Sequence, residues 1–206
     1  MDHKTKTLTS VAVFCGSSPG KNPAHLALAE RLGQAIADRD LRLVYGGGGL
    51  GLMGAVARTA FGNGAAVLGV IPDVLKEAEA LLPEIDHEIV EDMHARKIRM
   101  YREADAFIVL PGGIGTLEEA IEVLSWQRLN LHEKPILFLS DTGYWDGLIR
   151  EFKHLIEEGF SPESMAKDVL TATSPGEAFD LIQQRLDNPV QREPLNIGTA
   201  SVESLA

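Results

Sequence analysis

A glutamate closely follows a glycine-rich loop in the segment VLPGGIGTLEEA, which spans residues 109–120. The apolar run 106–110 predicts a buried strand, Pro111 and Gly112 begin the loop, and a helix is expected from Thr116. Glycines let backbone N–H groups face a bound phosphate, and a helix N-terminus adds partial positive charge. Glu119, in the first turn of that helix, would lie beside a bound phosphate ester. The segment therefore predicts a phosphate-binding loop next to a carboxylate that could react.

Glu119 also has a purely structural interpretation. Thr116 and Glu119 fit a capping box, in which the threonine caps the helix and the glutamate returns to the N–H of the cap. The local sequence favours capping, whereas the preceding glycine-rich loop favours a reactive role. The two roles are compatible.

Basic residues are concentrated in the segment MHARKIR, residues 93–99, of a chain whose formal net charge is −11. Arg96 and Lys97 begin a predicted helix that leaves another strand end, so both can reach the same pocket as Glu119. An arginine fork suits bidentate contact with a phosphate or a carboxylate. Arg99 and Arg102 are expected on the solvated face of this helix.

Two further loops at predicted strand ends are suited to anions. The first contains Gly16 and Ser17 within CGSS, and the second contains Gly47 and Gly48 within a run of four glycines. Ligands of open parallel sheets bind beyond the carboxyl ends of the strands. Three such loops in one domain therefore indicate one composite site for a phosphorylated ligand.

The second loop also satisfies a dinucleotide-binding pattern. Gly49, Gly51 and Gly54 form GxGxxG after a strand, and Asp73 follows about twenty residues later. Asp73, however, follows Pro72 beyond the strand end, and a simple NAD site gives the Pro111 loop no role. The dinucleotide interpretation is therefore disfavoured, and the lack of a GK[ST] motif disfavours NTP hydrolysis.

The elements that must position these residues alternate between strands and helices. Strands are predicted at residues 11–14, 41–45, 66–71, 87–90, 106–110, 135–139 and 169–170. Helices are predicted from about residue 23 and at residues 51–62, 93–103, 116–129, 145–158 and 175–186. This order predicts an α/β fold: a single Rossmann-like three-layer domain with a mostly parallel sheet of about seven strands.

Length and composition indicate one globular domain. The chain has 206 residues, of which 45% are hydrophobic and 24% are charged. Residues 1–186 are assigned to this domain, and residues 187–206, with two prolines and little periodicity, to a loosely ordered C-terminal tail. Cys15 is the only cysteine, which excludes a disulfide framework and a CxxC zinc site. It has no evident histidine partner, so a nucleophilic role is disfavoured.

The compartment and the classes of partner follow from the same data. The polar N-terminus lacks the apolar core of a signal peptide, and no run approaches 18 apolar residues. A cytoplasmic protein that binds no membrane is expected. The net charge of −11 disfavours nucleic acid as a partner.

Taken together, PGGIGTLEE, MHARK, the early CGSS and the YGGGGLGLMG loop resemble the Lonely Guy (LOG) family of phosphoribohydrolases. The resemblance extends from about residue 11 to residue 179. It implies hydrolysis of the N-glycosidic bond of cytokinin riboside 5′-monophosphates, and often of AMP, to free base and ribose 5-phosphate. It also implies a Rossmann-like fold and a homodimer. Many members were once labelled lysine decarboxylases, but neither Lys97 nor Lys134 lies in a context that suggests a pyridoxal-phosphate Schiff base.

The resemblance also implies roles for individual residues. Arg96 and Glu119 correspond to the catalytic arginine and glutamate of the family. Its nucleotide-binding positions correspond to Lys97, Gly112, Gly113, Gly115, Thr116 and Glu118. Glu79 corresponds to a substrate-contacting glutamate, and Ser125 stands where many relatives have threonine. These residues join Gly16, Ser17, Gly47 and Gly48 as candidate substrate-binding residues.

The reaction implied by the resemblance passes through a cationic, oxocarbenium-like sugar. Glu119 would stabilise that cation, orient the ribose hydroxyls or activate water, and Arg96 would keep Glu119 ionised or contact the substrate. The scheme requires no metal and no cofactor. The alternative is a non-catalytic carrier of a phosphorylated ligand, because molybdenum cofactor carriers have a similar PGGxGT loop.

The predicted helix 116–129 is apolar on more than one face, whereas a helix on the surface of a sheet needs one apolar stripe. Its apolar residues are Leu117, Ala120, Ile121, Val123, Leu124, Trp126 and Leu129. One face is expected against the sheet and another against a second copy of the chain. The alternative is burial beneath the helix that begins near Trp145.

Overall fold

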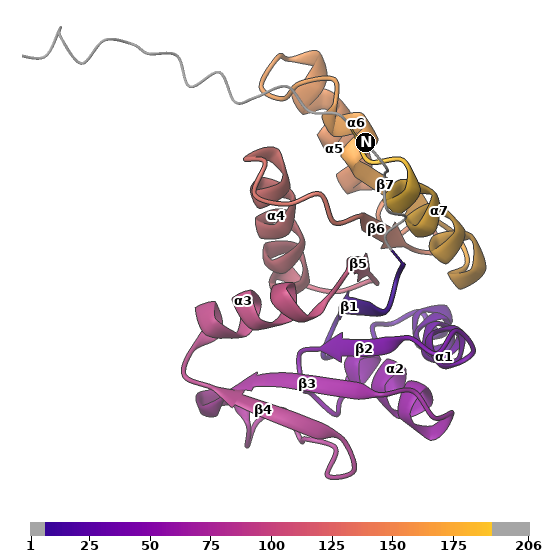
Figure 1. Cartoon of the computed structure of the whole chain (residues 1–206), viewed down its shortest axis with the longest axis vertical. Coiled ribbons are helices and arrows are strands. Elements are labelled where there is room, and N and C mark those ends of the chain that lie inside the picture. The colour runs from indigo at the N-terminus through magenta and orange to yellow at the C-terminus, as the bar shows by residue number, and fades with distance from the viewer. Residues whose placement is uncertain (1–6, 191–206) are drawn as a thin grey trace, which may run out of the picture.

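The computed structural model describes residues 7–190 and contains a single sheet of seven strands (Figure 1). The strands are β1 (Ser10–Phe14), β2 (Arg42–Tyr45), β3 (Val67–Pro72), β4 (Asp86–Val90), β5 (Ala106–Val109), β6 (Ile136–Leu139) and β7 (Val169–Ala172). Their order across the sheet is β4-β3-β2-β1-β5-β6-β7, and every pairing in the described part of the chain is parallel. The predicted α/β fold is confirmed, and the sheet is parallel throughout instead of mostly so.

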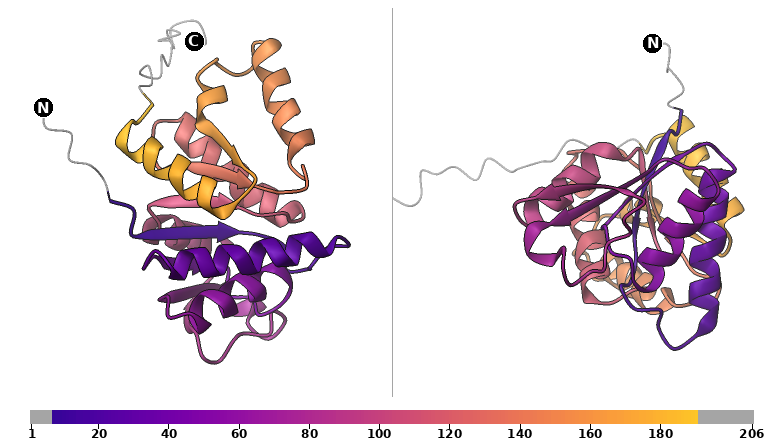
Figure 2. Two further views of the ribbon diagram at one scale, coloured as in Figure 1. Left: turned by 90° about the vertical axis from the view of Figure 1, so that its right-hand side faces the viewer. Right: turned by 90° about the horizontal axis from the view of Figure 1, so that it is seen from below.

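Helices cover both faces of this sheet (Figures 1 and 2). The helices are α1 (Pro23–Ala37), α2 (Gly51–Gly62), α3 (Met93–Glu103), α4 (Ile114–Arg128), α5 (Asp146–Glu157), α6 (Met165–Asp168) and α7 (Pro175–Asp187). A short 3₁₀ helix, η1, spans Asp73–Leu75. Helices α1, α2 and α7 pack on one face, and α3, α4 and α5 pack on the other, which gives the predicted three layers.

Two apolar cores explain why the strands are nearly continuous hydrophobic runs. Val11 and Val13 of β1 point into the core beneath α1, α2 and α7. Ala12 and Phe14 of the same strand point into the core beneath α3, α4 and α5. Since successive side chains of a strand point to opposite faces, a sheet buried on both sides needs apolar residues at every position.

The order of the strands determines where a ligand is expected to bind. Strands β2, β3 and β4 extend from β1 toward one edge of the sheet, whereas β6 and β7 extend from β5 toward the other edge. The neighbours β1 and β5 therefore form the topological switch point, beyond whose carboxyl ends ligands of such sheets bind. The CGSS loop follows β1 and the PGGIG loop follows β5.

The start of α4 differs from the prediction. The helix begins at Ile114, with Gly113 as its N-cap and no side-chain hydrogen bond to the cap. Thr116 is thus inside the helix, and the capping box with Glu119 is not formed, so the predicted capping role of Glu119 is wrong. The two shortest helical segments, η1 and α6, were not predicted.

Among residues 7–190, no helix combines the length and the apolar character needed to cross a bilayer. Helix α7 ends at Asp187, and most of the predicted C-terminal tail lies outside the described residues.

Candidate active site

Two of the glycine-rich loops meet at the switch point. The N–H of Gly16 donates to the carbonyl of Pro111 at 3.1 Å, and the N–H of Leu52 donates to the carbonyl of Gly16 at 3.0 Å. Beyond them lies a cavity of about 300 Å³, lined by residues 16–20 and 111–113 with His25, Leu52 and Tyr144. We refer to it as the switch-point cavity.

The backbone at the start of α4 is suited to an anion. No side chain caps this helix, so its first N–H groups are left for water or a ligand. Gly113 and Gly115 are exposed, whereas Gly112 is constrained by its neighbours. A Cβ on Gly112 would lie 2.1 Å from Oγ1 of Thr116. Glycine at this position allows the loop to approach the helix that it precedes.

Arg96 and Glu119 form a buried ion pair between α3 and α4. Nη2 of Arg96 lies 3.6 Å from Oε1 of Glu119, and both side chains are about nine-tenths buried. Arg96 reaches this place because Asp92 caps α3, where Oδ1 of Asp92 accepts the N–H of Ala95 at 2.8 Å. Nη2 of Arg96 also donates to the carbonyl of Gly46 at 3.3 Å. The structure thus brings together the two residues predicted to be catalytic.

The second glycine loop makes room for site side chains. All four glycines of residues 46–49 are buried. A Cβ on Gly46 would lie 1.8 Å from Nη2 of Arg96, and a Cβ on Gly48 would lie 2.5 Å from Oε2 of Glu79. The sequence predicts that this run binds an anion, whereas in the structure Gly46 and Gly48 leave room for the side chains of Arg96 and Glu79. Gly47 and Gly48 stay candidate substrate-binding residues.

Glu79 carries a buried oxygen that lacks a hydrogen-bond partner. Its Oε2 has no partner within the protein, while its backbone carbonyl accepts the N–H of Gly49 at 2.8 Å. A buried carboxylate oxygen without a partner is costly unless a ligand satisfies it. The role of Glu79 in substrate contact stays a prediction.

The protein environment acts on the charge of Glu119 in two directions. Burial raises the pKa of the Glu119 carboxyl, and the guanidinium of Arg96 opposes that rise. Burial also raises the pKa of the nearby Cys15 thiol, with Glu119 adding to the shift. Cys15 is therefore not activated as a nucleophile, in agreement with its lack of a histidine partner in the sequence.

Lys97 connects the same two helices closer to the surface. Its Nζ lies 2.6 Å from Oε1 of Glu118 and 3.0 Å from Oε2 of Glu122. Burial by itself would lower the pKa of Lys97, but its hydrogen bonds to Glu118 and Glu122 outweigh burial, and the pKa is raised. Lys97 and Glu118 are thus next to the Arg96–Glu119 pair, as predicted.

Ser125 lies apart from the switch-point cavity. Its hydroxyl donates to the carbonyl of Ile121 at 2.8 Å. The residue lines a separate groove of about 380 Å³ between α4, α5 and α6, whose other lining residues include Leu124, Leu129 and Phe152. Within this one chain, the structure does not bring Ser125 to the other candidate residues.

Sequence reasoning missed His25 and Tyr144 in the cavity wall. Tyr144 donates its hydroxyl to the carbonyl of Gly112 at 2.7 Å, and its ring lies edge-on to the ring of His25. Both residues follow the carboxyl ends of strands at the switch point or next to it, and that position was the available signal.

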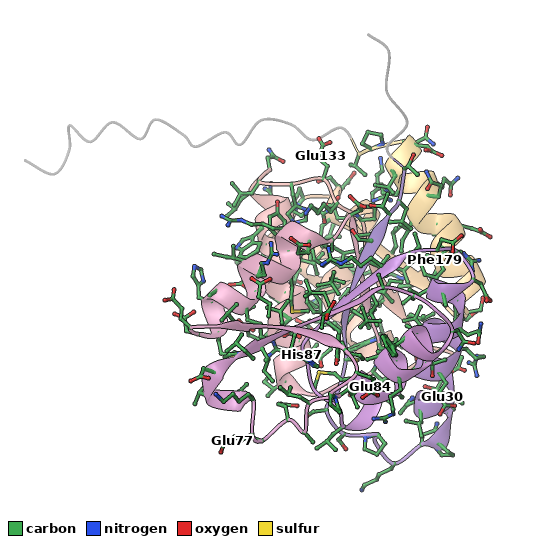
Figure 3. The ribbon with its side chains drawn as sticks, turned by 60° about the horizontal axis from the view of Figure 1, so that its bottom comes forward. Glu30, Glu77, Glu84, His87, Glu133 and Phe179 are labelled. Atoms are coloured by element: carbon green, nitrogen blue, oxygen red, sulfur yellow. The ribbon has the colours of Figure 1, made fainter. Side chains whose placement is uncertain are left out.

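A second unpredicted group supports the glycine run. His87 on β4, labelled in Figure 3, places Nε2 3.1 Å from the carbonyl of Gly47. The hydroxyl of Tyr45 donates to the same carbonyl at 3.2 Å. Gly69 leaves space for this arrangement, because a Cβ there would lie 2.5 Å from the His87 ring. These contacts fix the loop onto which Arg96 packs.

The fold and the candidate site define a doubly wound α/β protein with a cavity at its switch point. A family model described as "Possible lysine decarboxylase" matches residues 53–182. The chain is 42% identical over 185 residues to the cytokinin riboside 5′-monophosphate phosphoribohydrolase LOG7 of Arabidopsis thaliana, covering 89% of this chain and 84% of the relative. It is 47% identical over 160 residues to the phosphoribohydrolase of that name from Rhodococcoides fascians, covering 75% and 79%. The chain belongs to this family, the LOG phosphoribohydrolases.

Solved structures show the same fold at lower identity. The Moco carrier protein from Chlamydomonas reinhardtii aligns with a TM-score of 0.66 at 20% identity, covering 87% of this chain and 98% of that one. The molybdenum cofactor binding protein from Rippkaea orientalis aligns with a TM-score of 0.65 at 22% identity, covering 86% and 97%. Similarity at this identity concerns the fold alone.

Proposed function

We propose that this protein hydrolyses the N-glycosidic bond of cytokinin riboside 5′-monophosphates and of AMP, releasing the free base and ribose 5-phosphate. The observation that carries the proposal is the buried Arg96–Glu119 pair, in which Arg96 contacts the glycine run at Gly46 and Glu119 lies on the helix that follows the PGGIG loop. Relatives 42% and 47% identical to this chain bear the name of this activity.

Glu119 is the group proposed to act on the sugar. Departure of the base leaves positive charge on the ribose, and a carboxylate held in a buried site stabilises that charge more strongly than water does. The same carboxylate can orient a ribose hydroxyl or accept a proton from the attacking water. Stabilising the cation and accepting a proton both require Glu119 to be ionised.

Arg96 is proposed to keep Glu119 ionised and correctly placed. Its guanidinium opposes the rise that burial imposes on the pKa of Glu119. Its position is fixed by the cap of α3 and by the carbonyl of Gly46. Such a preorganised pair loses little energy to reorganisation when charge develops in the transition state.

The switch-point cavity is proposed to bind the 5′-phosphate, which does not react. The uncapped start of α4 supplies backbone donors, and Ser17 lines the same cavity. The binding energy of a non-reacting group can position the anomeric carbon against Glu119.

The alternative of a carrier is weaker for this chain. Molybdenum cofactor carriers share its fold at 20–22% identity, whereas the relatives named as phosphoribohydrolases are about twice as similar in sequence. A carrier also has no evident need for a buried carboxylate beside an anion site.

The test is to incubate the pure protein with AMP and with isopentenyladenosine monophosphate and to measure free base by chromatography. We expect base from at least one substrate, and none from either with Glu119→Gln. Tight binding of both nucleotides without release of base would overturn the hydrolase proposal in favour of a carrier.

We also propose that the protein is a homodimer that uses the apolar groove beside α4. Ile121 on this helix and Leu129 at its C-cap are 38% and 49% exposed, and both line the groove with Leu155. The groove lies between α4 and α5. This face of α4 is therefore not buried beneath α5, which was the alternative to a dimer. A second copy seated here would lie next to Ser125, which one chain alone leaves away from the site.

A further inference from the structure

His25 is a buried imidazole in the wall of the switch-point cavity. It lies in the first turn of α1 and is 8% exposed. Its Nδ1 is buried and has no hydrogen-bond partner. The CGSS loop turns back onto the ring at Gly20, whose φ is +71° and whose Cβ, if present, would lie 3.3 Å from Cδ2 of His25. Nothing in the proposed mechanism uses this side chain.

Tyr144 connects His25 to the third loop. The two rings lie edge to face with centroids 5.4 Å apart and an interplanar angle of 77°. The hydroxyl of Tyr144 donates to the carbonyl of Gly112 at 2.7 Å. The imidazole, the tyrosine and the Gly112 backbone therefore form one wall of the cavity.

The chemistry of this wall suits an anion. Among the described residues that line the cavity, none is acidic, although the chain has a formal net charge of −11. Because Nδ1 of His25 is buried without a hydrogen-bond partner, a ring proton is favoured on Nε2 over Nδ1. Nε2–H is then the donor that the ring can offer to a ligand.

We propose that His25 is a phosphate-binding residue. Its Nε2–H donates to an oxygen of the 5′-phosphate in the switch-point cavity and adds a side-chain donor to the backbone N–H groups at the start of α4. Tyr144 is a positioning residue that holds the imidazole against the loop. The inference rests on the proposed function to the extent that the substrate carries a phosphate.

The test measures the affinity of the full chain for ribose 5-phosphate by calorimetry, so that it does not depend on turnover. His25→Phe keeps a ring of similar size and removes both nitrogens, whereas His25→Gln keeps an amide N–H in reach of the cavity. We expect His25→Phe to weaken binding by about tenfold or more, because a hydrogen bond to a charged group is lost. His25→Gln should stay within about threefold of the wild type. The exposed His154 on α5 supplies a matched control, His154→Phe, which should not change the affinity.

A second measurement uses the unmodified protein. The ¹⁵N resonances of the His25 ring should move when ribose 5-phosphate is added, while those of His154 should not. An unchanged affinity in His25→Phe, equal losses in the phenylalanine and glutamine variants, or static His25 resonances would each overturn the inference and leave the proposed function standing. A wild type that binds neither ribose 5-phosphate nor AMP would overturn both.

Discussion

Burying the charge of either Arg96 or Glu119 alone would be energetically costly. A buried carboxylate tends to become neutral, and a buried guanidinium without a partner is strongly destabilising. Placed 3.6 Å apart, each compensates part of the cost of burying the other. Arg96 thereby favours the ionised form of Glu119 against the effect of burial.

Replacing Glu119 by glutamine should separate catalysis from binding. Glu119→Gln preserves shape but carries no charge for a cationic transition state, so we expect kcat to fall by about 10²–10³-fold or more. The affinity for AMP, measured by calorimetry, should change little. Near wild-type turnover in this variant would exclude Glu119 as the catalytic carboxylate.

Arg96 should be poorly replaced by lysine. Both contacts of Arg96, to Glu119 and to the carbonyl of Gly46, are made by Nη2, which lies one bond farther along the side chain than the nitrogen of a lysine, so we expect Arg96→Lys to retain only about 1% of wild-type kcat. Arg96→Ala should be inactive. Full activity of the lysine variant in steady-state assays would show that only the charge matters at this position.

The activity should fall on the acid side at a higher pH than an ordinary glutamate would give. Burial raises the pKa of Glu119 above its usual value of 4.5, and the reaction requires the ionised form. Activity is then present above the raised pKa and is lost as the pH falls through it. The measurement is kcat against pH in the range where the protein stays folded by circular dichroism. A profile whose acid limb lies at or below pH 4.5 would contradict the role given to Glu119.

At the scale of elements, the strands and the main helices were predictable because their signals are local. The strands are short apolar runs buried on both faces, and Asn22, Asp92 and Ser174 cap the helices that follow them. Helix α6 has four residues and no capping side chain, so it leaves no periodic pattern to detect.

The start of α4 was misplaced for a physical reason. Thr116 looked like an N-cap, but the helix begins two residues earlier at Ile114 and leaves its first N–H groups without a side-chain cap. The sequence rules for helix starts assume a capping side chain. Helix α4, whose N-cap is the glycine Gly113, does not follow them.

The candidate site was predictable to the extent that it lies in motifs. Arg96 and Glu119 were found through MHARK and PGGIGTLEE, and the structure brings them together. The positions of His25 and Tyr144 in the cavity wall depend on the order of the strands, which composition and spacing do not specify.

The second glycine loop leads to a prediction at this scale. A methyl group on Gly46 would occupy the place of Nη2 of Arg96, which must then move. We expect Gly46→Ala to fold, because the displaced atom is the end of a flexible side chain, but to lose at least about 90% of its activity. Gly62→Ala is the control, since a Cβ there meets nothing within 4 Å. Thermal melts and kcat of both variants check the expectation, and an active Gly46→Ala would show that Arg96 need not lie where it does.

At the scale of the molecule, helix α4 buries part of its apolar surface against the sheet and leaves part of it exposed. Val123 on α4 is buried against the sheet and Trp126 packs edge-on against Tyr101, so neither is the best position to test assembly. Ile121 and Leu129 are exposed along the groove instead. The excess apolar residues noted in this helix therefore divide between the core and an open face.

Charge on that open face should weaken the proposed dimer. We expect Ile121→Asp to shift the protein toward a monomer of about half the mass, because it would bury a carboxylate without a partner in an apolar interface. Light scattering at micromolar concentration measures the shift. Phe61→Asp, at an exposed position of α2 on the other face of the sheet, should not change the mass. A wild type that is monomeric and fully active would refute the dimer.

The switch point between β1 and β5 divides the chain into two halves that each hold one partner of the reactive pair. The first half runs from β1 through α3, and Arg96 lies in its last helix. The second half runs from β5 through α7, and Glu119 lies in its first helix. Neither half contains both residues, and the two meet only where the halves pack together. A change in how the two halves pack across the β1–β5 pairing would therefore alter the separation of Arg96 and Glu119 even when both residues are kept.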